Sequence, residues 1–89
     1  MSLFSRLFGG GSQEPDPPES YEGFTITPEP IKDGNHFRIA ARIEKEVAGQ
    51  LKSHHLIRAD TLESHEAAKA ASLGKARQVI DEQGERLFD

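Results

Sequence analysis

The stretch FRIAARIEKEVAGQLKSHHLIRAD, residues 37–60, decides the fold of this chain. Its odd positions from Phe37 to Ile43 are apolar, whereas most even positions between them are charged. Alternation with a period of two is typical of a strand that is buried on one face. The pattern is interrupted at Ala48 and Gly49 and then resumes, so the stretch predicts two antiparallel strands joined by a tight turn.

The turn between these two strands sets which side chains share a face. We expect a three-residue loop over residues 47–49, with its glycine in the left-handed conformation. This register pairs Ile39 with Ile57, and it pairs Glu44 with Lys52 as an opposite-charge cross-strand pair. The even positions of the last strand then lie on the solvent side of the sheet.

Another strand is expected before this stretch, over about residues 21–31. Its two prolines, Pro28 and Pro30, donate no N–H, so they must occupy non-hydrogen-bonded positions or a free edge. A four-residue loop over residues 32–35 satisfies this requirement and pairs Ile31 with His36. Its asparagine is expected to adopt the left-handed conformation.

The last third of the chain is predicted to be a helix. Ser64 is a suitable N-cap, and Gly84 either ends the helix or weakens its last turn. An apolar stripe at helical spacing is expected to face the sheet, with these members: Leu62, Ala70, Leu73, Ala76, Ile80 and Leu87. The predicted fold class is α+β, a three-stranded antiparallel β-meander with one C-terminal helix packed on one face (β-β-β-α).

Residues 1–20 differ in composition from the rest of the chain. The opening MSLFSRLF could form one apolar helical face, which could dock on a membrane or a partner: Leu3, Phe4, Leu7 and Phe8. A frayed terminus is the other reading, because so short a helix is unstable alone. The Gly- and Pro-rich residues that follow are typical of a linker. We therefore expect one β-β-β-α domain over residues 21–89.

Composition excludes several classes of protein. The chain has 89 residues, no cysteine and a formal net charge of -4. A disulfide framework and a thiolate metal site are therefore excluded, and a reducing, cytoplasmic location is expected. The acidic balance argues against a generally basic protein that neutralises phosphates. No apolar run approaches the roughly 20 residues of a membrane span.

Four segments of the chain, MSLFSRLFGGG, FRIAARIEKEV, SHHLIRADTL and KARQVIDEQGERLF, resemble the small bacterial proteins of the HlyU family. The resemblance covers nearly the whole chain. The family name implies a transcriptional activator, but it transfers no catalytic or binding residue to this sequence. With one expected helix the chain has no helix-turn-helix, so contact with DNA would need the sheet or a partner.

The expected registers place a basic surface on the solvent side of the sheet. Its candidate residues for binding a partner or an anion are Arg38, Arg42, Lys52, His54, Leu56 and Arg58. Arg38 would lie opposite Arg58, which is unfavourable unless Glu29 or a bound anion neutralises the pair. Leu56 would be exposed among these charges, as an interface anchor is. The surface could be an ordinary solvated face, a protein interface or a nucleic-acid interface.

The histidines do not predict a metal site. His54 and His55 are adjacent, and adjacent strand residues point to opposite faces. We expect His55 on the core side. The sequence also has no glycine-rich phosphate loop and no nucleophile-base constellation, so we expect no enzymatic activity, no cofactor and no small-molecule substrate.

The expected partners are proteins. The third predicted strand has an open edge without prolines, and we expect a weak homodimer through this strand or through the Leu56 face. DNA is a partner only as far as the family resemblance implies it.

Overall fold

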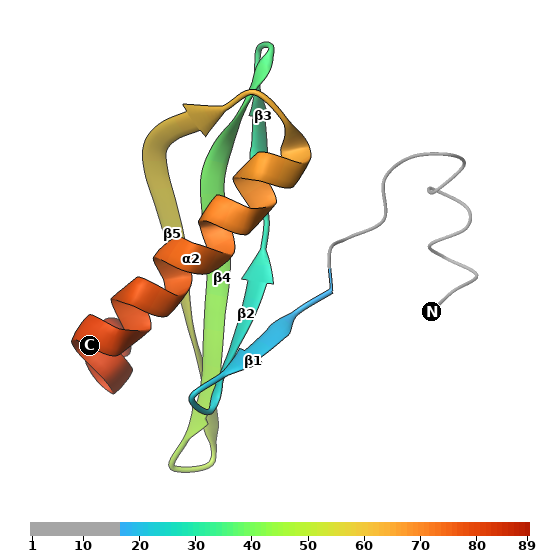
Figure 1. The fold of residues 1–89 in the computed structure, drawn as a ribbon. Coiled ribbons are helices and arrows are strands. Elements are labelled where there is room, and N and C mark those ends of the chain that lie inside the picture. Colours follow the sequence, from blue (N-terminus) through green and yellow to red (C-terminus); the bar gives the residue numbers. More distant parts are fainter. Residues whose placement is uncertain (1–16) are drawn as a thin grey trace.

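The alternating stretch forms two long strands, β4 (His36–Val47) and β5 (Gln50–Leu62), in the computed structural model, which describes residues 17–89. Three shorter strands complete the antiparallel sheet: β1 (Glu19–Tyr21), β2 (Phe24–Pro28) and β3 (Ile31–Asp33). One long helix, α2 (His65–Gln83), crosses one face of the sheet and is followed by a short 3-10 helix, η1 (Gly84–Phe88) (Figure 1). The α+β class with one C-terminal helix is confirmed, whereas the described residues form five strands and not three.

The extra strands arise from the first predicted strand. Strands β2 and β3 pair with the same edge of β4 in one register, and they are separated at Glu29 and Pro30. The Glu29 N–H donates to the Ala40 carbonyl over 2.9 Å. Because hydrogen-bonding direction alternates along a strand, the nitrogen of Pro28 points away from β4. Strand β1 pairs with β2 and begins at Glu19, within the stretch whose composition predicts a linker.

Both predicted loops of the meander are shorter in the structure. Ala48 and Gly49 have φ of 53° and 81°, so they form a two-residue turn that pairs Val47 with Gln50. The predicted three-residue loop is therefore wrong, and the one-residue shift turns every side chain of the first part of β5 to the other face. In the preceding hairpin Gly34, and not Asn35, has the positive φ, and Asp33 pairs with His36.

A bulge interrupts the pairing of β4 with β5. Ala40 pairs with Ile57 and Arg38 with Thr61, so residues 58–60 of β5 face only one residue of β4. On the other side of β4, where β2 and β3 are separated at Glu29 and Pro30, the Ala40 N–H donates to the Ser72 hydroxyl of α2 over 3.1 Å. The same hydroxyl donates to the Ala68 carbonyl over 2.6 Å. Ser72, the fully buried polar residue of the described core, therefore supplies the acceptor that the interrupted ladder lacks.

The helix begins at the predicted N-cap, and it ends at Gly84, which is one of the two roles predicted for this glycine. The Ser64 side chain accepts from the Ala67 N–H, and Gly84, with φ of 57°, donates to the Ile80 carbonyl. Its buried face differs from the predicted stripe, because Ala70 is exposed and Leu73 only half-buried. The core cluster joins this face to the sheet through Phe24, Ile26, Ala41, Ile43, Leu56, Ala76, Ile80 and Leu87.

Candidate interaction surfaces

The face of the sheet opposite α2 is covered by no element among residues 17–89, and we call it the outer face. The observed registers place these side chains on it: Thr25, Thr27, Glu29, Ile31, Arg42, Glu44, Glu46, Leu51, Ser53, His55 and Ile57. Three large apolar residues of this face are exposed, with relative accessibilities of 69% for Leu51, 59% for Ile57 and 42% for Ile31. An apolar side chain in this position is available to a partner.

The predicted basic surface is divided between the two faces of the sheet. Strand β5 pairs Lys52 with Lys45, His54 with Ile43 and Leu56 with Ala41, so these side chains point toward α2. Leu56 is only 7% exposed, and its predicted role as an exposed anchor is wrong. The one-residue difference in the β4–β5 turn is the cause, because it exchanges the two faces of a strand.

Two arginines of the predicted surface, Arg38 and Arg42, have acidic neighbours. A nitrogen of the Arg42 guanidinium lies 3.4 Å from a Glu29 oxygen and another lies 3.8 Å from Glu44. Arg38 donates to Asp33 of the adjacent strand over 2.5 Å. Arg38 also lies opposite Thr61 and not opposite Arg58, whose carbonyl accepts from it at 3.5 Å. The expected pairing of Arg38 with Arg58 is therefore not formed, and the acidic partner of Arg38 is Asp33.

The histidines lie apart. His54 is half-buried on the helix side, and His55 is exposed on the outer face opposite Arg42, the reverse of the prediction. The His65 ring makes an edge contact with Phe37, with 5.6 Å between ring centroids. Among residues 17–89 no three histidine, aspartate or glutamate side chains converge as metal ligands.

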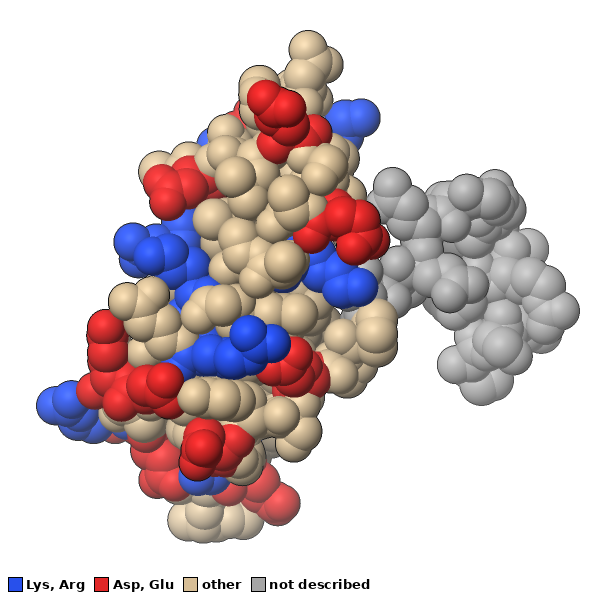
Figure 2. Space-filling model, in the orientation of Figure 1, with Lys and Arg blue, Asp and Glu red and all other residues tan. Residues whose placement is uncertain are grey.

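The solvent side of α2 carries charges of both signs. Figure 2 shows lysines and arginines interspersed with aspartates and glutamates on the face of the molecule that the helix covers. Arg77 of α2 is held by Glu19 of β1. A recognition helix projects into the major groove beside a second, supporting helix. Within the described part of the chain α2 is instead packed flat on the sheet, and only η1 accompanies it.

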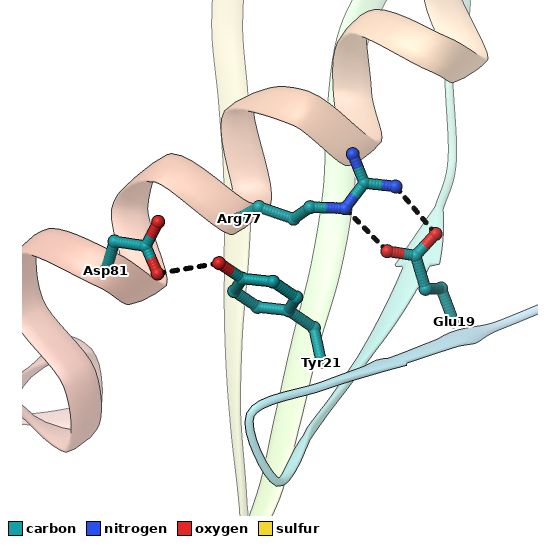
Figure 3. Close-up of polar contacts among 4 residues, drawn as sticks. All are labelled: Glu19, Tyr21, Arg77 and Asp81. Atoms are coloured by element: carbon teal, nitrogen blue, oxygen red, sulfur yellow. Dashed lines mark hydrogen bonds and ion pairs between the residues drawn. The ribbon is translucent and has the colours of Figure 1, made fainter.

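Two polar contacts tie β1 to α2, and we call them the β1 clasp (Figure 3). The Arg77 guanidinium donates two hydrogen bonds to Glu19, of 2.6 and 2.8 Å. The Tyr21 hydroxyl donates to Asp81 over 2.8 Å. The hydrogen bond from Arg77 lowers the pKa of Glu19, and the hydrogen bond to Asp81 raises the pKa of Tyr21. The clasp therefore fixes β1 on α2.

A second contact holds the C-terminal end. The Lys45 ammonium lies 2.9 Å from Glu85 and 4.7 Å from the centre of the Phe24 ring. The Phe24 ring also stacks on Phe88, with 6.1 Å between centroids. The β1 clasp and the contact of Lys45 with Glu85 were not predicted from the sequence. Their partners are about 40 to 60 positions apart and belong to no local pattern.

The predicted docking segment, with Leu3, Phe4, Leu7 and Phe8, lies outside the described residues. Within residues 17–89, no helix combines the length and the apolar composition that crossing a membrane requires.

Comparison with known proteins identifies a family. No curated protein and no solved structure matches the chain. The family model described as transcriptional activator HlyU matches residues 2–88, which is nearly the whole sequence. The chain therefore belongs to the HlyU family.

Proposed function

We propose that this protein regulates transcription through contacts with proteins, made by its outer face and by the free edge of β5. Family membership supports the regulatory role. The observation that carries the choice of protein over DNA is the exposure of Leu51 and Ile57 on the outer face. Arg42 of that face and Arg38 of the same strand already have acidic partners. An interface with DNA has the opposite character, because it presents unneutralised cations to phosphates.

The proposal includes a cytoplasmic location and no enzymatic activity. The alternative is an adaptor module that uses the same surface outside transcription. The segment with Leu3, Phe4, Leu7 and Phe8 adds a second possible contact, with a membrane or with the same partner, and this contact stays a prediction from sequence.

Direct DNA binding is the reading that an experiment must separate from this one. We would titrate the full chain into a fluorescent DNA duplex at about 50 and 200 mM salt, where six to ten phosphate contacts change affinity by roughly 10³–10⁵. We expect no saturable binding and no such salt dependence. Saturable binding that weakens steeply with salt would contradict the proposal.

Transcript measurement tests the regulatory part. We expect that deleting the gene and replacing Ile57 by glutamate alter the same transcripts, because Ile57 is 59% exposed and its replacement leaves the core intact. Thr27→Ala, on the same face, is the control. Unchanged transcripts after deletion would favour the adaptor alternative.

A further inference from the structure

The outer edge of β5 is the longest unpaired strand edge among the described residues. Strand β5 has 13 residues and, within residues 17–89, pairs only with β4. Strands β1 and β3, which also lie at edges, have three residues each. The edge formed by β2 and β3 carries Pro28 and Pro30, which cannot donate to another strand.

The pairing with β4 determines which backbone groups of β5 are free. The two-residue turn makes Val47 and Gln50 a hydrogen-bonded pair, so the even-numbered residues up to Leu56 direct their N–H and C=O groups toward β4. The odd-numbered residues from Leu51 to Ile57 direct theirs outward. Their side chains lie on the outer face, so free backbone groups and exposed apolar side chains belong to the same residues.

The arrangement of these residues is self-complementary. Leu51 and Ile57 are the two most exposed large apolar residues described, and each lies three positions from His54. We infer that β5 pairs antiparallel with β5 of a second copy, around a two-fold axis at His54. Leu51 then lies opposite Ile57 of the other copy, and Ser53 lies opposite His55. Every one of these pairs joins residues whose hydrogen-bonding groups point outward.

Charge selects this register over its neighbours. A pairing centred on His55 would set Lys52 opposite Arg58 of the other copy, and it would oppose two cations twice. A pairing centred on Ser53 would set Leu51 opposite His55 and leave Ile57 beyond the paired segment. The His54 register opposes no two lysine or arginine side chains and joins apolar residues to apolar residues.

The bulge limits the assembly to two copies. Residues 58–60 depart from the regular ladder and bend the strand, which ends the edge available for pairing. A two-fold contact also uses the same β5 edge of both copies, so no β5 edge is left for a third copy to join. The inference deepens the proposed function, since it names a second copy as one protein partner of that surface.

Sedimentation of the full chain over a range of concentrations tests the inference. We expect a monomer–dimer equilibrium, and we expect Leu51→Lys and Ile57→Glu each to weaken it at least about tenfold, since each change removes two symmetric apolar pairs. Ile31→Glu is the matched control, because Ile31 is exposed on the same face but at the opposite side of the sheet. A chain that stays monomeric at all concentrations would contradict the inference. The outcome of the DNA titration does not depend on this result.

Two further variants test the register and the edge. Mixing the Leu51→Lys and Ile57→Glu proteins is expected to restore dimers, because the introduced lysine meets the introduced glutamate at one end and the native apolar pair remains at the other. Ser53→Pro removes an outward N–H without breaking a bond to β4, so it should abolish dimers while the circular-dichroism spectrum and unfolding midpoint are retained. Failure of mixing to restore dimers would refute this register. Unchanged dimerisation of a folded Ser53→Pro protein would exclude edge pairing.

Discussion

Replacing Ser72 by alanine isolates the contact that joins the helix to the interruption in the sheet. The Ser72 side chain is fully buried, and its hydroxyl accepts the Ala40 N–H over 3.1 Å. Alanine fits the same space and leaves the Ala68 carbonyl with its ordinary helical partner. The Ala40 N–H has no such substitute, because the neighbouring strand is interrupted at Glu29 and Pro30.

The expected cost follows from this difference. A buried donor left without a partner costs about 1–3 kcal/mol, and the higher helix propensity of alanine recovers about 0.5 kcal/mol. We therefore expect Ser72→Ala to lower the free energy of unfolding by about 0.5–2.5 kcal/mol.

Urea unfolding at constant protein concentration measures this cost. The midpoint should fall while the slope of unfolding free energy against urea is unchanged, as expected when only stability is altered. Ser53→Ala is the matched control, because Ser53 is exposed on the outer face, and we expect it to stay within about 0.5 kcal/mol of wild type. If Ser72→Ala loses no more stability than this control, the account of the sheet interruption is wrong.

Three other predictions concern the register and the β1 clasp. Leu56→Ala should lower the free energy of unfolding by about 2–4 kcal/mol in urea, and Ile57→Ala by only about 0.5 kcal/mol. A larger loss for Ile57→Ala would show that Ile57 is the buried residue, as the three-residue loop requires. Glu19 has a lowered pKa when folded, so it contributes stability above its usual value of 4.5 that is lost as pH falls through its folded pKa. Glu19→Gln should therefore reduce the loss of unfolding free energy as the pH falls through the acid range. A loss equal to that of wild type would refute this role of Glu19. Tyr21 has a raised pKa, so its contribution is present below 10.0 and is lost as pH rises through the folded value. Tyr21→Phe should lower the unfolding midpoint at neutral pH and remove this alkaline loss, which thermal unfolding across the two pH ranges would show.

Period-two alternation predicted the long central strand. Ser64 predicted the start of the helix, and its end at Gly84 was one of two alternatives. These signals are local and agree with the tertiary packing around Ile43. The turn at Ala48 and Gly49 was ambiguous, because a non-glycine residue rarely adopts a positive φ and a longer loop avoids this. The structure places Ala48 at φ of 53°, and this single turn decides which face Leu56 occupies.

The candidate surface depended on that register, so it was predicted less well than the fold. The sequence predicted that the even-numbered residues of β5 are exposed, among them Leu56. The structure instead exposes odd-numbered residues, including Leu51 and Ile57. The contacts of Ser72 with Ala40 and of Arg77 with Glu19 join residues that share no periodic pattern. Only their three-dimensional arrangement reveals them.

Hydrogen exchange of the β5 amides at two protein concentrations tests the central claim most directly. The alternation predicts that even-numbered amides, such as those of Lys52 and His54, are protected at both concentrations, because they bond to β4. The odd-numbered amides from Leu51 to Ile57 should exchange rapidly in dilute solution and become protected at high concentration, as the second copy pairs with them. Equal exchange of the odd-numbered amides at both concentrations would contradict the account of β5 as the edge that receives a partner.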